Sequence, residues 1–284
     1  MKLFGNSKKH KRDFNKLKEK NEVGGQNDHQ PHNVAKSDRK KTIRRRIIYG
    51  VLYATGLAVI IFAGIGMLGI LNEDREARDE YDELREIIYD VTFEITHAGE
   101  ADLFEPETAE ESFTELSDIN PDFVGWIDIP GTDVNYPVVR GPDNSYYLRR
   151  TFRGQENPAG SVFMDYRNRP DFTTPVTTLY GHNMRDGSMF SSLMRFTNET
   201  FRNENREIRI VTRAGEILYY EIFAVWRTDA WDDVYFLDFD DVYGAGEFFN
   251  YYSDHFLILS TCWRSADSDP DDRFIVAAGR LPAR

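Results

Sequence analysis

Cysteine is almost absent from this chain, which has one, Cys262, in 284 residues. A single thiol cannot form an intrachain disulfide, so the fold is not a disulfide-stapled scaffold, and cysteine usage does not fix the compartment. The sequence also lacks a C-x-x-C pair, a glycine-rich phosphate loop and an internal repeat. These absences argue against a redox or zinc motif, a P-loop nucleotide site and a repeat architecture.

Charge is missing throughout residues 47–71, IIYGVLYATGLAVIIFAGIGMLGIL. At about 1.5 Å rise per residue, a helix of this length exceeds the roughly 30 Å hydrocarbon core of a bilayer. A cleaved signal peptide would have a shorter apolar region and would not follow 46 polar residues. We therefore predict a transmembrane helix at residues 47–71.

The charges on either side of this helix differ in sign. Residues 1–46 contain 15 Lys/Arg against 5 Asp/Glu, and the rest of the chain contains 20 against 43. The positive-inside rule predicts a single-pass protein of the cell membrane, with its N-terminus cytoplasmic and its C-terminal domain extracellular. The basic tail, residues 1–46, is expected to be disordered. Topology and anionic lipid already account for its charge, so we expect no nucleic-acid partner.

Residues 72–112 have the pattern of a stalk. An amphipathic helix is predicted from Asn72 to about Thr96, because apolar residues recur there at spacings of three and four among charges. The acidic stretch Gly99–Glu115 contains few apolar residues and reads as a linker that leads into another short helix. The globular domain is assigned to residues 113–284.

Short β-prone segments follow one another through this domain, separated by Gly, Pro and Asn. Eight of them with only brief helical patches, such as Ser188–Phe196, predict a mainly β fold, a closed or nearly closed eight-stranded barrel with helical decorations. The predicted strands are Val124–Ile129, Val134–Val139, Ser161–Asp165, Val176–Tyr180, Ile208–Thr212, Ile217–Trp226, Phe256–Thr261 and Arg273–Ala278.

One acidic segment, Asp267–Asp271, begins like a calcium-binding EF-hand loop. Its sixth position is Asp272 where that loop needs glycine, and its twelfth is Ala278 where it needs a bidentate carboxylate. The EF-hand interpretation fails, and a solvated turn is favoured over an irregular calcium site. We expect neither a metal nor a cofactor.

The run Phe256–Cys262 ends on the lone thiol. A lone cysteine is often a small core residue. At the end of a buried strand beside a turn, however, a thiol is held rigidly and can still be reached, as a nucleophile must be. A cysteine nucleophile also requires partner groups elsewhere in the barrel.

Such a nucleophile needs an imidazole or a cation nearby, and six histidines are available. His10, His29 and His32 lie in the tail and His97 lies in the stalk, so only two fall in the barrel. His255 precedes Cys262 by seven residues, which puts it roughly 20 Å or more away along an extended strand. His182 remains by elimination, at the end of a predicted strand in Tyr180-Gly181-His182. Taken alone, such a histidine is more often a hydrogen-bonded structural residue.

The candidate cation is Arg273, which opens the strand after the Cys262 strand. If these two strands form a hairpin, the end of one lies beside the start of the other. Arg273 would then reach the group that Cys262 attacks. The alternative is a surface salt bridge with Asp271 or Asp272.

Several motifs together resemble the sortases, membrane-anchored cysteine transpeptidases of Gram-positive bacteria, and in particular class B. They span about residues 113–282. The one departure is Ile258, where the first Thr of the family's TLxTC motif would stand. The motifs are Asn120-Pro121-Asp122-Phe123-Val124-Gly125-Trp126-Ile127-Asp128-Ile129-Pro130-Gly131, Tyr136-Pro137-Val138-Val139, Gly181-His182-Asn183-Met184, Asp186-Gly187-Ser188-Met189-Phe190, Leu259-Ser260-Thr261-Cys262 and Arg273, together with a long aromatic insertion, Asp229–Asp254.

The resemblance implies an activity and a set of partners. Cys262 would attack a threonine carbonyl in a C-terminal sorting signal of a secreted protein, with His182 as acid and base and Arg273 on the oxyanion or the substrate backbone. Ser260 and Thr261 would contact the substrate backbone. The signal would be NPxTN-like or LPxTG-like, and the acceptor an amine on a peptidoglycan precursor.

Two alternatives come from other classes of protein. An extracellular papain-like or cell-wall endopeptidase usually has its Cys before its His, whereas His182 precedes Cys262 here. A noncatalytic adhesive barrel would need neither the thiol nor Arg273. Mutation of Cys262 would leave the binding of such an adhesin intact.

Overall fold

The computed structural model describes residues 32–88, 106–264 and 267–282. The chain divides into two compact units, residues 1–63 and 64–284. The described part of the first unit is the N-terminal portion of one long helix. The second unit contains the remaining elements.

Helix α1 (His32–Ile87) contains the predicted membrane span. Its stretch Lys41–Gly69 is long and apolar enough to cross a membrane, and no side chain in the most apolar window is buried. The prediction of a disordered tail is wrong for residues 32–46, which are helical, while residues 1–31 lie outside the described part. Lys and Arg are good helix formers and a formed helix extends at little cost, so the apolar helix continues into its basic flank.

Helix α3 (Pro106–Ile119) occupies most of the acidic stretch that we predicted to be a linker. Its first residue is a proline, which costs no hydrogen bond at that position. Its Phe113 and Leu116 are buried in the main apolar core. The linker prediction is therefore wrong for residues 106–115. The stalk predictions for residues 89–105 fall outside the described part.

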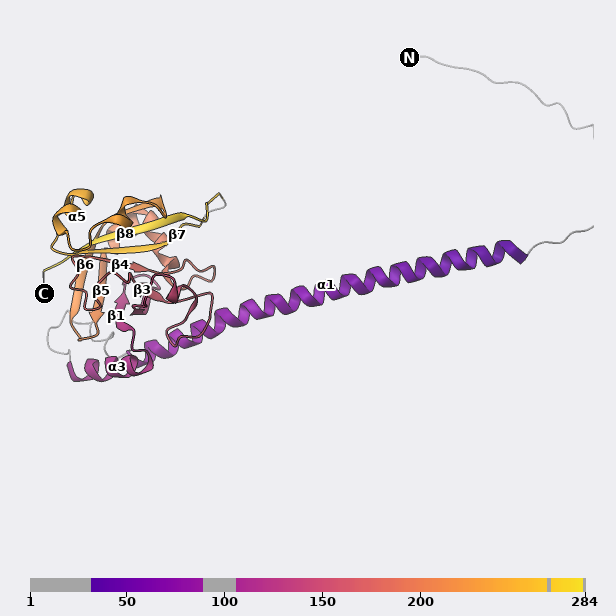
Figure 1. Cartoon of the computed structure of the whole chain (residues 1–284), viewed down its shortest axis with the longest axis horizontal. Coiled ribbons are helices and arrows are strands. Elements are labelled where there is room, and N and C mark those ends of the chain that lie inside the picture. The colour runs from indigo at the N-terminus through magenta and orange to yellow at the C-terminus, as the bar shows by residue number, and fades with distance from the viewer. Residues whose placement is uncertain (1–31, 89–105, 265–266, 283–284) are drawn as a thin grey trace, which may run out of the picture. The chain divides into compact units, whose positions relative to one another are not determined.

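Eight strands close into a β-barrel in the order β1-β2-β3-β4-β7-β8-β6-β5 (Figure 1). The pairs β2–β3 and β4–β7 are parallel and the others antiparallel. The predicted fold is confirmed, and β6 and β8 extend beyond their predicted ends because they pair along the whole of β8. The strands are β1 (Phe123–Asp128), β2 (Asn135–Val139), β3 (Val162–Met164), β4 (Val176–Tyr180), β5 (Glu207–Thr212), β6 (Ile217–Asp229), β7 (Phe256–Cys262) and β8 (Asp272–Arg280).

Residues of β7 alternate between two apolar clusters. Leu257 and Leu259 belong to the main cluster, which fills the barrel. Phe256 and Ile258 belong to a second cluster on the outer face. Because side chains of a strand alternate with a period of two, the same outer face receives Cys262.

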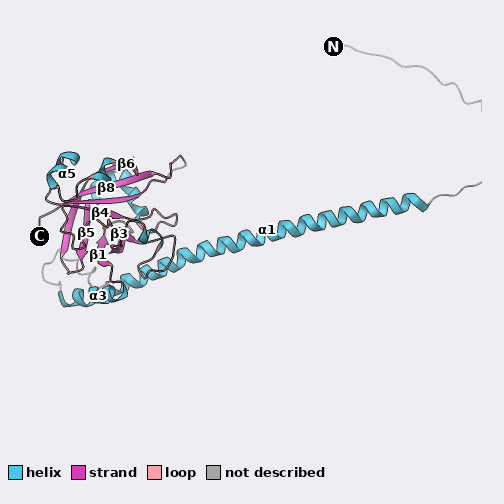
Figure 2. Ribbon diagram, viewed as in Figure 1, coloured by secondary structure: helices cyan, strands magenta, loops and turns pink. Residues whose placement is uncertain are grey.

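The outer face of β7 and β8 is covered by the insertion between β6 and β7. Val234, Phe239 and Ala245 of the insertion are buried in the second apolar cluster together with residues of both strands. Figure 2 distinguishes the helical segments from the strands of the barrel. The insertion contains η3 (Asp233–Phe236) and α5 (Val242–Phe249), and the other short helical segments are η1 (Tyr146–Arg149), η2 (Phe190–Thr197), which corresponds to the predicted patch, and α4 (Glu199–Glu204).

Candidate active site

Cys262 is the last residue of β7 and is half-buried. Its partner in the antiparallel β7–β8 pair is Arg273, so the predicted hairpin is confirmed. Arg273 also shares the outer face with Ile275 and Ala277, whose side chains join the second apolar cluster. Both functional groups therefore emerge on the same side of the same hairpin.

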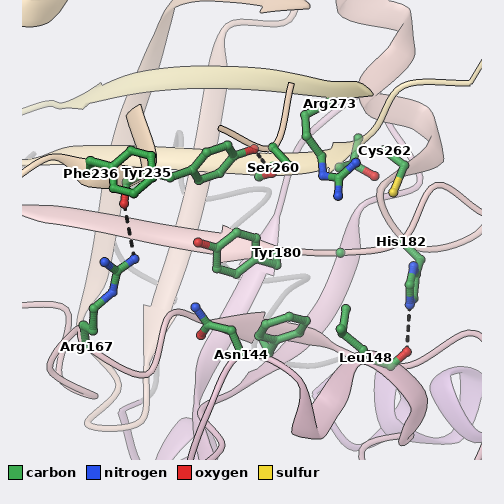
Figure 3. Close-up of a pocket in the computed structure, with 14 residues that line it drawn as sticks. Asn144, Leu148, Arg167, Tyr180, His182, Tyr235, Phe236, Ser260, Cys262 and Arg273 are labelled. Atoms are coloured by element: carbon green, nitrogen blue, oxygen red, sulfur yellow. Dashed lines mark hydrogen bonds between the residues drawn. The ribbon is translucent and has the colours of Figure 1, made fainter. Parts of the chain in front are cut away.

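His182 reaches this place through the parallel pairing of β4 with β7. The register pairs Tyr180 with Ser260, and Gly181 continues it with a backbone hydrogen bond to the Ser260 carbonyl (N–O 3.2 Å). Two residues after Gly181, the Asn183 side-chain amide donates to the Cys262 carbonyl (Nδ2–O 3.0 Å). His182 thus lies beside the end of β7. Figure 3 shows it at the same end of the pocket as Cys262 and Arg273.

The His182 ring is oriented by a backbone carbonyl of η1. Its Nε2 lies 2.7 Å from the Leu148 oxygen (Figure 3). A carbonyl oxygen can only accept a hydrogen bond, so Nε2 carries the hydrogen. Nδ1 is then the nitrogen that can gain or lose a proton, and the ring can act as an acid and a base.

Arg273 is held by the loop that it follows. Its Nη1 donates to the carbonyls of Pro270 (2.9 Å) and Asp272 (3.0 Å). The alternative of a salt bridge with Asp272 is not favoured, because the Asp272 carboxylate pairs instead with Arg227 (2.5 Å). Among the ion pairs of the described residues, none joins Arg273 to Asp271. A guanidinium beside the thiol provides positive charge and directed N–H donors for an oxyanion.

A pocket of about 400 Å³ opens beside these three residues. All five site residues predicted from the sequence line it, namely His182, Ser260, Thr261, Cys262 and Arg273. Among the residues that the structure describes, no group of three or more His, Cys, Asp or Glu side chains could hold a metal ion. The lining consists of Asn144, Leu148, Phe163, Arg167, Tyr180, Gly181, His182, Ala230, Tyr235, Phe236, Ser260, Thr261, Cys262 and Arg273.

Ser260 and Thr261 present different groups to the pocket. Ser260 is on the outer face, and its hydroxyl hydrogen-bonds with that of Tyr235 (2.8 Å). Thr261 is 2% exposed, and its hydroxyl has no hydrogen-bond partner among the described residues. The strand alternation turns the Thr261 side chain toward the barrel, so its backbone is the part suited to substrate contact.

The polar wall of the pocket was not predicted from the sequence. It is organised by Asp165, whose side chain is fully buried and accepts hydrogen bonds from Tyr180 (2.9 Å), Asn144 (2.8 Å) and Arg167 (2.9 and 2.8 Å). Burial alone would raise the pKa of Asp165, but hydrogen bonds from Arg167 and Asn144 outweigh it and lower that pKa. Tyr180 could have been predicted as a pocket residue because it ends the strand that leads into Gly181 and His182. Asn144 and Arg167 lie in loops whose sequence has no pattern that predicts a place in the pocket.

The aromatic insertion contributes to the pocket through two residues. Tyr235 and Phe236 line it, and burial raises the pKa of Tyr235. Phe239, Phe249 and Tyr251 instead pack against the outer face of the barrel. The insertion is therefore partly a pocket wall and partly a cover for β7 and β8.

A half-buried thiol on a strand of a closed barrel, with a histidine and an arginine beside it, is the arrangement that a cysteine nucleophile requires. The sortase domain model matches residues 127–281. The chain belongs to the sortase family, and the relatives below place it in class B.

Two curated relatives are similar over most of their length. The chain is 32% identical over 188 residues to sortase B of Listeria monocytogenes, covering 60% of this chain and 74% of that protein. It is 28% identical over 236 residues to sortase B of Staphylococcus aureus, covering 78% and 92%.

Solved structures agree with this assignment. A Staphylococcus aureus sortase B–substrate complex has a TM-score of 0.60 at 28% identity, over 74% of this chain and 98% of that one. Sortase B of Bacillus anthracis in complex with AAEK1 has a TM-score of 0.59 at 30% identity, over 75% and 99%. These proteins share the barrel that carries the pocket.

Proposed function

We propose that this sortase is a transpeptidase in which Cys262 is the nucleophile. The observation that supports this most strongly is the meeting of Cys262, His182 and Arg273 at one end of a single pocket. Its substrates would be secreted proteins that end in an NPxTN-like or LPxTG-like sorting signal. The acceptor would be an amine on a peptidoglycan precursor.

The first half-reaction forms a thioester. The Cys262 thiolate attacks the threonine carbonyl, and Arg273 stabilises the oxyanion or holds the substrate backbone. The bond from the threonine carbonyl to the next residue's nitrogen then breaks. His182 gives a proton to the departing amine.

The second half-reaction reverses these roles. The acceptor amine attacks the thioester, His182 removes a proton from it, and the thiolate of Cys262 leaves. The new amide joins the threonine to the acceptor. Without an acceptor, water replaces the amine and the enzyme becomes a slow hydrolase.

The rest of the pocket supplies surfaces for an extended peptide. The backbones at Ser260 and Thr261 can hydrogen-bond a substrate strand, while Tyr235 and Phe236 offer aromatic contact. The positive-inside rule supports an orientation in which residues 1–46 are cytoplasmic and the barrel faces outward.

A panel of sorting pentapeptides, assayed by mass spectrometry with and without a cell-wall amine, tests this function. We expect cleavage after threonine for one class of signal, and an amide product when the amine is present. Cys262→Ala and His182→Ala should abolish turnover, and Arg273→Ala should lower it steeply in a folded protein. Cleavage of unrelated peptides only would favour the endopeptidase, and no cleavage with retained binding would favour the adhesin.

A further inference from the structure

His182 is fixed from two sides by different parts of the barrel. Its ring is bound to the Leu148 carbonyl at the end of η1. Its own carbonyl accepts a hydrogen bond from the Phe190 amide (2.8 Å), at the start of η2. The position of the imidazole therefore depends on η1 together with the segment that follows it, and on the turn at residues 183–189.

Helix α1 holds the first of these two segments. The Tyr81 hydroxyl donates to the Gly160 carbonyl (2.6 Å), and Tyr81 is only 3% exposed. Gly160 packs so closely on Leu148 that a Cβ there would lie 2.7 Å from the Leu148 carbonyl oxygen. The Glu80 carboxylate of α1 also accepts a hydrogen bond from the Arg153 amide (2.8 Å). The backbone that presents the Leu148 carbonyl thus rests on α1.

The same helix holds the second segment through Tyr136. The rings of Tyr81 and Tyr136 meet edge to face, with centroids 5.3 Å apart. The Tyr136 hydroxyl accepts a hydrogen bond from the Met189 amide (2.9 Å). Met189 has a positive φ of 57°, which a non-glycine residue keeps only when its surroundings impose it. Tyr136 is therefore one of the groups that hold this turn in place.

An ion pair adds a direct link between α1 and the turn. Arg78 lies 3.7 Å from the Asp186 carboxylate. The other oxygen of Asp186 accepts hydrogen bonds from the amide (3.1 Å) and hydroxyl (2.7 Å) of Ser188. Arg78 thus contacts the residue that organises the centre of the turn.

We propose that the part of α1 from Glu73 to Ile87 positions the catalytic imidazole, with Tyr81 as its central residue. This inference rests on the proposed role of His182. Tyr81 and Arg78 are positioning residues, because neither lines the pocket where the reacting atoms meet. Helix α1 also contains the candidate membrane span, so the element that anchors the enzyme would belong to its catalytic apparatus.

The first test removes one hydroxyl from the full-length enzyme in detergent micelles. Tyr81→Phe keeps the ring and loses the hydrogen bond to Gly160. We expect kcat for a cleavable sorting peptide to fall about tenfold with KM little changed, because a misplaced acid–base group slows chemistry rather than binding. The pH profile of Cys262 alkylation by iodoacetamide should shift as well. The control is Tyr220→Phe, a buried tyrosine of β6 whose charged neighbours are Arg280 and Glu216, which should change neither readout.

A conservative variant supplies the matched comparison. Arg78→Asp should lower kcat, and Arg78→Lys, which keeps the positive charge that faces Asp186, should retain most of it. Arg75→Asp makes the same charge change at an exposed position of α1 and should have no effect. A merely stabilising contact would lower the melting temperature of these variants without moving kcat or the alkylation profile.

Two outcomes would overturn the inference, and they differ from failure of the proposed function. Unchanged kcat and an unchanged alkylation profile in Tyr81→Phe would show that α1 does not position the imidazole. If instead His182→Ala retained turnover and the wild-type alkylation profile, the catalytic role of His182 would itself be wrong, and this inference would fall with it. The alkylation readout requires no peptide substrate, so it gives a result whichever sorting signal the enzyme recognises.

Discussion

The side-chain amide of Asn183 hydrogen-bonds to the backbone carbonyl of Cys262 across 3.0 Å. This contact joins the residue after the histidine to the cysteine itself. The contact lies beyond Tyr180 and Ser260, the last paired residues of β4 and β7. At this point the strand pairing no longer fixes the distance between the two chain segments. Asn183 therefore sets the spacing of the two proposed catalytic residues.

Replacement of Asn183 by Ala should lower both stability and activity. Asn183 is 8% exposed and its hydrogen bond to Cys262 is partly buried, so we expect the loss of this bond to cost about 1 kcal/mol. We expect urea unfolding of the full chain to report a loss of this size, with a fall in kcat. Asn205→Ala, which removes a similar amide-to-carbonyl contact in α4 (2.9 Å), should lower stability alone. Equal kcat values for the two variants would contradict this role.

Gly181 should not tolerate a side chain. A Cβ at this position would lie 2.7 Å from atoms of the Phe190 ring, which is fully buried. Gly181→Ala must move either the ring or the histidine that follows, so we expect about tenfold or greater loss of kcat. The double variant Gly181→Ala/Phe190→Leu replaces the ring by a smaller side chain and should recover part of the lost kcat. Full activity in Gly181→Ala would show that the turn is not tightly constrained.

The buried carboxylate of Asp165 should make stability depend on acid pH. Its folded-state pKa is lowered, so the ionised form stabilises the fold. That contribution is complete above the unfolded pKa of about 3.9 and is lost as pH falls through the folded pKa. The difference in unfolding free energy between the wild type and Asp165→Asn should be constant from about pH 7 to 5. This difference should shrink below about pH 4. Asp118→Asn, exposed on α3, supplies the baseline. A difference that grows at low pH would contradict the assignment.

Much of this architecture was accessible from the sequence. The eight strands stood out because β-prone runs alternate with Gly, Pro and Asn, and the pairing of Cys262 with Arg273 followed from one short loop. Helicity at residues 32–46 and 106–115 was missed because both stretches are rich in charge. Residues 32–46 are nevertheless helical because Lys and Arg are good helix formers. Residues 106–115 belong to α3, whose Phe113 and Leu116 are buried in the main apolar core.

The candidate site was predictable only in part. His182 was found by counting histidines, but no periodicity could show that its ring would bind the Leu148 carbonyl. No local pattern could predict the hydrogen bonds of Asp165 either, because its partners come from separate segments of the chain. Contacts of this kind are set by tertiary packing rather than by local pattern, and they form most of what holds the site in place.

The membrane topology can be tested on cells. Protease added to cell-wall-stripped cells should remove the barrel and spare residues 1–46, because the positive-inside rule predicts that the basic flank of the span stays in the cytoplasm. Antibodies against a tag at each end of the chain would follow the two parts. Protection of the barrel together with loss of the N-terminal tag would reverse the proposed orientation.

The central claim is that Cys262 forms a thioester with the threonine of a sorting signal. Intact-mass spectrometry of the enzyme, mixed with a cleavable sorting peptide and quenched in acid, measures this directly. We predict an adduct with the mass of the peptide up to and including threonine, located on Cys262, absent from Cys262→Ala and discharged by an amine. Cleavage of the peptide by Cys262→Ala, or an adduct that maps to another residue, would contradict the account.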